Sequence, residues 1–243
     1  MRIFYLSKRR LKLILLISLT VMALGIGYAL VIACNIASTA EVAGPYYQGS
    51  TNKKMVSFTF NVDWGEEYVP SLLEILQESD IKATFFITGR WASLHPELVK
   101  SIATGGHDIG NHGQAHRHLK KLSDGELEQE IIQAEKILLK ESGKKPTLFA
   151  PAYGEIDARI SGVCDRLGYQ VIMWSLDTID WQKPDVATIV KRVVPRIHND
   201  AIILMHPTDP TVQSLPEIIT RLKADGYKIV PVSQLIQPEE KSN

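Results

Sequence analysis

Residues 55–87 read MVSFTFNVDWGEEYVPSLLEILQESDIKATFFI and contain one complete strand–helix–strand unit. Residues 56–60 and 83–87 are short runs rich in β-branched and aromatic side chains, which is typical of buried strands. Between them, residues 68–77 carry apolar side chains at helical spacing. A strand, a helix and a second strand in this order predict two parallel strands joined by a crossover helix.

The same alternation continues to the end of the chain. Further strands are predicted at residues 107–110, 147–149, 170–174, 201–205 and 228–231, and further helices at residues 96–103, 123–141, 158–167, 186–197 and 215–224. The clearest helix begins with Ser123 followed by Glu126, the pair that forms a capping box. About seven such units predict an α/β fold, either a wound sheet or an incomplete β/α barrel, with the functional site at the carboxyl ends of the strands.

The N-terminal part of the chain differs in composition from the rest. Residues 1–12 are basic and contain no acid, whereas residues 13–33 carry no charge and match the roughly 20 residues that cross a bilayer. The positive-inside rule places the basic end in the cytoplasm and everything after the apolar run outside. We therefore expect a cytoplasmic segment over 1–12, a single-pass transmembrane signal anchor over 13–34, a linker over 35–53, a folded domain over 54–238 and a tail over 239–243.

Two alternatives to an uncleaved anchor stay open. One is a cleaved signal peptide that ends near residues 37–40, which would make the protein secreted. The other is a lipoprotein signal, because Val31–Cys34 is similar to a loose bacterial lipobox. All three interpretations place the folded domain outside the cytoplasm, and the first places it at the cell membrane.

Composition excludes several classes of function. The chain has 27 Lys and Arg against 27 Asp and Glu, and this balance argues against a nucleic-acid binder, which needs a basic excess. Cys34 and Cys164 are too few for a disulfide framework or a thiolate metal site. No nucleophile elbow and no P-loop occur in the sequence, which argues against serine hydrolases and nucleotide-binding proteins. We expect the chain to act as a monomer.

Side chains that bind metals or move protons follow several of the predicted strands. They are Asp63, His112, His116, Tyr153, Asp177, Asp180 and His206. Two histidines four residues apart, together with one carboxylate, would leave coordination positions open for water and substrate, as in catalytic metal sites. His206, at the end of an apolar strand and near an acidic turn, would be an imidazole held by a carboxylate and suited to proton transfer. The alternative is that Asp177 and Asp180 cap a turn or helix.

Five segments, in order, resemble the motifs of the polysaccharide deacetylase family, also called the NodB-homology family or carbohydrate esterase family 4. They are Thr59–Gly65, Gly106–His116, Phe149–Gly154, Asp177–Trp181 and Leu204–His206. The resemblance covers residues 55–236 and implies a distorted (β/α)7 barrel. It also implies a hydrolase that removes N-acetyl groups from peptidoglycan, a spore glycan or a chitin-like polymer. The anchor and the segment NVDWGEE look similar to sporulation-associated deacetylases of Gram-positive spore formers.

The resemblance further implies roles for individual residues. A divalent metal, usually zinc, would be held by Asp63, His112 and His116. The metal would acidify a bound water, and the backbone N–H of Tyr153 would stabilise the oxyanion. His206, oriented by Asp177, would protonate the leaving amine. The pocket around the acetyl methyl group would be lined by Trp181, Leu204 and Pro151.

Two departures from the family pattern affect the predicted activity. Asn61 stands where the family has its general-base Asp, and Ala150 stands where the family has the Arg that pairs with that base. Their joint loss is coherent, because a buried Arg without its carboxylate would be an unpaired charge. Either metal-bound hydroxide attacks unaided, or Glu66 or Glu67 acts as the base, although both acids also suit the start of a helix. We therefore expect reduced activity, or alternatively an inactive glycan- or metal-binding relative with a structural role at the envelope. A hydrolase of another small amide or ester is a third interpretation.

Overall fold

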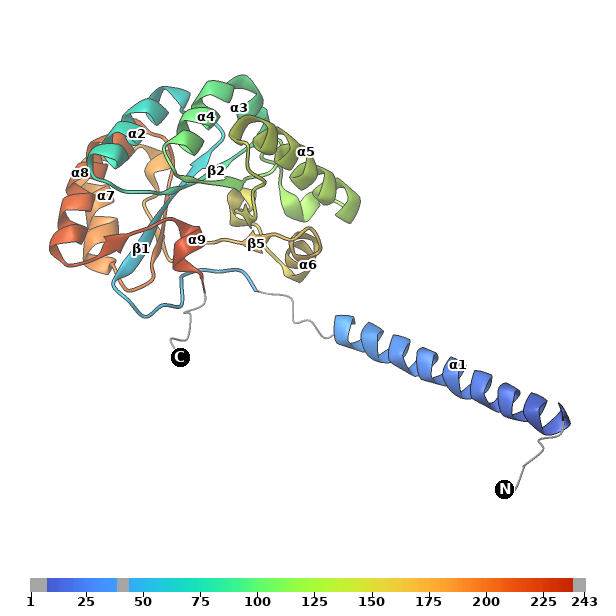
Figure 1. The fold of residues 1–243 in the computed structure, drawn as a ribbon. Coiled ribbons are helices and arrows are strands. Elements are labelled where there is room, and N and C mark those ends of the chain that lie inside the picture. Colours follow the sequence, from blue (N-terminus) through green and yellow to red (C-terminus); the bar gives the residue numbers. More distant parts are fainter. Residues whose placement is uncertain (1–7, 39–43, 238–243) are drawn as a thin grey trace. The chain divides into compact units, whose positions relative to one another are not determined.

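The computed structural model describes residues 8–38 and 44–237, and the chain divides into two units, Met1–Val42 and Ala43–Asn243. In the first unit, α1 (Lys8–Ser38) is one continuous helix, drawn in blue in Figure 1. None of the helices in the described part of the chain combines the length and apolar character needed to cross a membrane. The anchor over 13–34 therefore stays a prediction from the sequence, and residues 1–7 and 239–243 of the predicted end segments lie outside the described residues.

The second unit begins earlier than the sequence predicts. Tyr46 and Gln48, in the predicted linker, form isolated bridges with Ile172 and Ala201. The backbone N–H of Tyr46 donates to the carbonyl of Val171 at 2.8 Å. Residues 44–53 are therefore part of the folded unit, and only the segment before them separates it from α1.

A curled parallel sheet forms the centre of the second unit (Figure 1). Its strands are β1 (Met55–Val62), β2 (Thr84–Ile87), β3 (Asp108–Asn111), β4 (Leu148–Phe149), β5 (Gln170–Val171), β6 (Leu176–Asp177), β7 (Ile202–Met205) and β8 (Lys228–Ile229). The order is β5-β4-β3-β2-β1-β7-β6, with β8 paired to β1. No pairing among the described strands joins β5 to β6, so the sheet is an open, distorted barrel. The predicted strand 170–174 is thus only two residues long, and β6 is a separate strand.

The helices of the second unit are α2 (Val69–Glu78), α3 (Gly89–Leu94), α4 (Pro96–Thr104), α5 (Asp124–Ser142), α6 (Ala158–Arg166), α7 (Val186–Val193), α8 (Asp209–Ala224) and α9 (Val232–Leu235). Helices α2 to α8 cover the outside of the sheet, whereas α9 packs against its inward-facing residues Phe86 and Ile202 (Figure 1). The predicted capping box at Ser123 is confirmed. Helix α8 begins six residues before the predicted start at 215, because the Thr208 side chain caps it by accepting from the N–H of Thr211. Short 3-10 turns follow strands at Glu66–Tyr68, Leu119–Lys121, Ala152–Gly154 and Asp180–Gln182, and one extends α7 at Val194–Arg196.

Strand β1 determines where the site lies. Seven of its eight residues, Val56 to Val62, are buried, because it pairs with β2 on one side and with β7 on the other. The register sets Thr59 beside both Thr84 and Leu204. Since all three strands run in the same direction, their carboxyl ends reach the same edge of the sheet.

His107, just before β3, makes the stability of the fold depend on pH. Its ring is buried, and Nδ1 accepts the N–H of Ala83 at 3.1 Å. Burial lowers the pKa of His107 from 6.5 to about 4. The unfolded chain therefore takes up a proton at this residue before the folded chain does. The neutral His107 ring therefore contributes fully to the free energy of unfolding above pH 6.5. This contribution is lost as the pH falls toward 4.

We predict that His107→Gln reduces the acid dependence of stability between these two pH values by up to about 1.4 kcal/mol per pH unit. Gln keeps an acceptor for the Ala83 N–H but does not titrate. Urea unfolding measured as a function of pH tests this, with His198→Gln, at a half-buried position, as the control. Identical pH profiles for wild type and His107→Gln would contradict the prediction.

Candidate active site

A cavity of ≈ 410 Å³ opens at the carboxyl ends of β1, β3, β6 and β7. It is lined by Asn61, Asp63, Trp64, His112, His116, Tyr153, Gly154, Trp174, Asp177, Trp181, Leu204 and His206. Nine of the ten predicted site residues are in this set. The tenth, Pro151, is buried and precedes the turn that carries Tyr153. Trp64 and Trp174 were missed, because a tryptophan after a strand is equally typical of a core residue.

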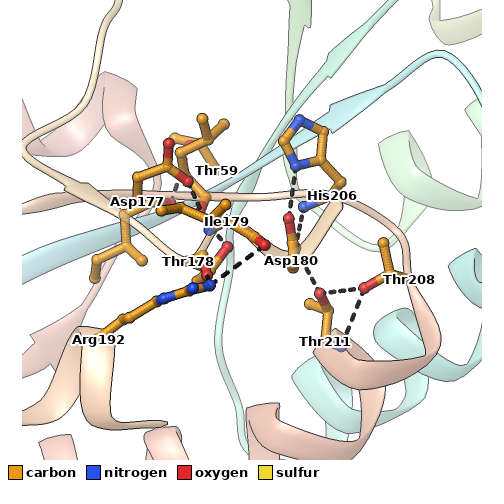
Figure 2. A network of polar contacts seen from close by, with 11 residues as sticks. Thr59, Asp177, Thr178, Ile179, Asp180, Arg192, His206, Thr208 and Thr211 are labelled. Atoms are coloured by element: carbon orange, nitrogen blue, oxygen red, sulfur yellow. Dashed lines mark hydrogen bonds and ion pairs between the residues drawn. The ribbon is translucent and has the colours of Figure 1, made fainter. Parts of the chain in front are cut away.

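His206 is fixed by a buried carboxylate. Its Nδ1 lies 2.7 Å from Oδ1 of Asp180, and its backbone N–H donates to Oδ2 of Asp180 at 2.6 Å (Figure 2). The Thr211 hydroxyl donates to the same Oδ2 at 2.6 Å, and Asp180 is fully buried. With Nδ1 engaged, Nε2 is the ring nitrogen left to exchange a proton. This is the arrangement of an oriented acid–base histidine.

The assignment of Asp177 as the orienting acid is wrong. In Figure 2 the contacts of His206 lead to Asp180, whereas Oδ1 of Asp177 accepts the N–H of Ile179 at 2.8 Å. Ile179 has a left-handed φ of 51°, and this turn carries Asp180 to the ring. The spacing of Asp177 and Asp180 in the sequence does not reveal which of the two acids this turn brings into contact with His206. Asp177 is the turn-capping residue of the alternative interpretation, and burial raises its pKa.

His112 and His116 lie together in the cavity. His112 is buried, and its Nδ1 lies 2.7 Å from the carbonyl oxygen of Ala150. Burial lowers the pKa of His112 to about 3 and lowers the pKa of His116 as well, so both rings are neutral near neutral pH. The two ring centres are 5.0 Å apart. The left-handed Gly113 (φ 81°) and His116 (φ 53°) turn the segment after β3 back on itself.

Asp63, the third predicted metal ligand, is bound by an arginine. Its Oδ1 accepts from Nε of Arg90 at 2.7 Å and from the Thr88 hydroxyl at 2.8 Å, and its Oδ2 pairs with Nη2 of Arg90. In the described part of the chain, no three His, Cys, Asp or Glu side chains are arranged to hold a metal ion. The predicted ligand set of Asp63, His112 and His116 therefore does not fit a metal in this arrangement. Arg90, which lies one helix away in the sequence, was not predicted.

The two substituted positions leave the cavity without the base that the family has. Asn61 is buried, and its side-chain oxygen has no hydrogen-bond partner in the structure. Ala150 contributes only backbone: its N–H donates to the carbonyl of Asn111, and its own carbonyl faces His112. Glu66 and Glu67 are exposed and do not line the cavity. Neither acid is therefore placed to replace the missing carboxylate.

Aromatic side chains form the rim of the cavity. Trp64, Tyr153 and Trp181 are 41%, 58% and 53% exposed. Trp64 lies nearly parallel to the His206 ring at a centroid distance of 6.0 Å. Gly65 (φ 82°) makes this placement possible, because a Cβ there would lie 2.2 Å from the carbonyl oxygen of Pro207. Exposed flat rings beside a polar cavity suit stacking against a sugar.

Comparison with known proteins confirms the predicted family. The polysaccharide deacetylase family matches residues 48–172. A peptidoglycan-N-acetylglucosamine deacetylase of Bacillus cereus is 35% identical over 76% of this chain and 90% of its own length. The chain belongs to the polysaccharide deacetylase family. An uncharacterised Bacillus subtilis protein, YlxY, is 41% identical over 79% of this chain, which spans 60% of the length of YlxY.

Solved structures of this deacetylase family include a relative without activity. BA3943 of Bacillus anthracis, described as a carbohydrate esterase family 4 pseudoenzyme, matches with a TM-score of 0.78 and 39% identity, over 80% of this chain and 69% of its own. A BA3943 mutant described as having restored enzymatic activity also matches with a TM-score of 0.78, at 37% identity over 80% and 71% of the chains. The similarity confirms the curled parallel α/β architecture.

The correction at Asp180 predicts a difference between two neighbouring acids. Asp180→Ala removes the buried carboxylate that contacts the backbone N–H and Nδ1 of His206 and accepts from the Thr211 hydroxyl. We expect it to lower the free energy of unfolding by about 3–5 kcal/mol. Asp177→Ala removes one turn hydrogen bond and should lower it by about 1 kcal/mol. Urea denaturation of the two variants measures both losses. Equal losses, or a larger loss for Asp177→Ala, would support the original assignment instead.

Proposed function

We propose that this chain binds the N-acetylated glycan of peptidoglycan in the cavity and does not hydrolyse it. The observation that carries the proposal is Asn61, buried at the cavity with an unpartnered oxygen where the family has its base. A carboxamide takes up no proton near neutral pH, so Asn61 does not activate water that enters the cavity. The deacetylase relatives from Bacillus cereus support peptidoglycan as the glycan.

Amide hydrolysis requires three actions, and the cavity retains one of them. The amine must be protonated as it leaves, and the His206–Asp180 pair suits this step. The attacking water must lose a proton, and this help is typically worth 10²–10⁴-fold in rate. The carbonyl must be polarised, and the carboxylate expected to hold a metal for that purpose is paired with Arg90. With two of the three actions missing, the geometry favours binding over turnover.

The same residues favour an acetamido ligand. A buried oxygen without a donor destabilises the protein by about 1–3 kcal/mol. The amide N–H of an N-acetyl group would donate to the Asn61 oxygen and remove that penalty. The exposed rings of Trp64 and Trp181 would stack against the sugar. The substitution that ends base catalysis thereby creates an acceptor for the uncleaved substrate.

A slow metal-dependent deacetylase is the second candidate. The retained His206–Asp180 pair favours it, because a protein that only binds glycans has little use for an oriented proton donor. In this case zinc, or another divalent metal, would have to displace Arg90 from Asp63. Catalysis without a dedicated base would make turnover slow.

Restoring the two family residues distinguishes these functions. We predict that full-length wild type releases no acetate from N-acetylglucosamine oligomers or peptidoglycan fragments with added zinc. At zinc concentrations high enough to displace Arg90 from Asp63, Asn61→Asp combined with Ala150→Arg should release acetate at least about 100-fold above background, because the arginine neutralises the buried aspartate. His206→Ala in that background serves as the control and should abolish the release. Equal acetate release by wild type and the double variant would favour the second candidate.

We also propose that residues 13–34 anchor the folded unit on the outer side of the cell membrane. The support is the uncharged run and the basic residues before it. A role in sporulation stays a prediction from the resemblance. We expect the full chain in the membrane fraction, with its folded unit digested by protease added to intact protoplasts. Protection from the protease would contradict this orientation, and recovery from the medium would favour a cleaved signal peptide.

A further inference from the structure

Arg90 and Asp63 form a two-pronged ion pair at the edge of the cavity. Asp63 follows β1, and Arg90 lies in the first turn of α3, directly after β2. Nε of Arg90 donates to Oδ1 at 2.7 Å, and Nη2 pairs with Oδ2. A planar guanidinium that meets both oxygens of a carboxylate is among the strongest and most directional pairings in proteins. Both oxygens through which Asp63 would bind a metal are therefore engaged.

The Asp63 carboxylate requires a positive partner in this position. Its side chain is only 7% exposed, and a carboxylate removed from water is destabilising unless it is paired. An arginine side chain stays protonated in proteins, so the Arg90 guanidinium supplies that positive charge. The positive charge in contact with Asp63 is thus carried by the chain itself.

The arginine reaches Asp63 from the solvent side. Its side chain is 52% exposed, whereas that of Asp63 is nearly buried. The guanidinium can therefore rotate into water without disturbing the core, but the carboxylate remains in place. A divalent cation and the Arg90 guanidinium would use the same oxygens and repel each other, so the two exclude one another.

We propose that Arg90 is the resident cation of the family's metal position and that it competes with divalent metals for Asp63. The competition lowers the metal affinity of the wild-type chain. Asp63 stays neutralised in the metal-free protein, which keeps the cavity folded and accessible to ligands. The measurement of this competition requires no glycan, so its outcome is independent of the glycan-binding proposal.

Zinc titration of the full chain, kept in mild detergent because residues 13–33 carry no charge, measures the competition directly. We expect Arg90→Gln to bind zinc at least about tenfold more tightly than wild type in isothermal titration calorimetry. Arg117→Gln is the matched control, because Arg117 is another exposed arginine paired with an acid, Glu126. It should bind zinc like wild type. Without metal, Arg90→Gln should melt at a lower temperature than wild type, and zinc should reverse that loss.

Two further variants keep the result decisive. Asp63→Asn in the Arg90→Gln background should remove the gain in affinity, since the gain depends on this carboxylate. Arg90→Lys keeps the positive charge but cannot pair with both oxygens of Asp63 at once. Its zinc affinity should therefore lie between those of wild type and Arg90→Gln. It replaces Arg90→Gln if that variant does not fold. Equal zinc affinities for wild type and the Arg90 variants, or a gain that survives Asp63→Asn, would overturn the proposal.

Discussion

The parallel pairing of β1 with β2 and β7 is the constraint on which the site depends. Because β1 is buried and central, its direction sets the edge at which all three strands end. Asn61 and Asp63 arrive there from β1, Arg90 follows β2, and His206 follows β7. The cavity is thus assembled from segments far apart in the sequence, and a shift of register in β1 would separate Asp63 from Arg90.

Two acids at the cavity are each paired with a basic side chain. The buried Asp180 is paired with His206, and Asp63 with Arg90. A third pair is replaced as a whole. Asn61 and Ala150 stand where the family has a carboxylate and an arginine, so neither position leaves an unpaired charge. The site is therefore stable as a folded arrangement although it lacks the base and the arginine that the family has. Stability of the site and its catalytic competence are separate properties here.

The sequence predicts the alternation of strands and helices and nearly all cavity residues, because both follow from local patterns and from the rule that strand ends meet. It does not predict Arg90, since nothing in a helix sequence shows which way a long, exposed side chain turns. It also does not distinguish Asp180 from Asp177, because the choice depends on the left-handed conformation of Ile179. The short length of β5 is not predicted, because the apolar run over residues 170–174 continues past the point where the strand ends.

The central claim is that the cavity retains a glycan-binding site and a proton donor but lacks the means to activate water. The most direct test is to incubate stoichiometric full-length protein with an N-acetylglucosamine oligomer and zinc, measure binding, and weigh the recovered oligomer by mass spectrometry. We predict saturable binding that Trp64→Ala weakens, and an oligomer that keeps all of its acetyl groups. Loss of acetyl groups from the recovered oligomer, abolished by His206→Ala, would contradict the account.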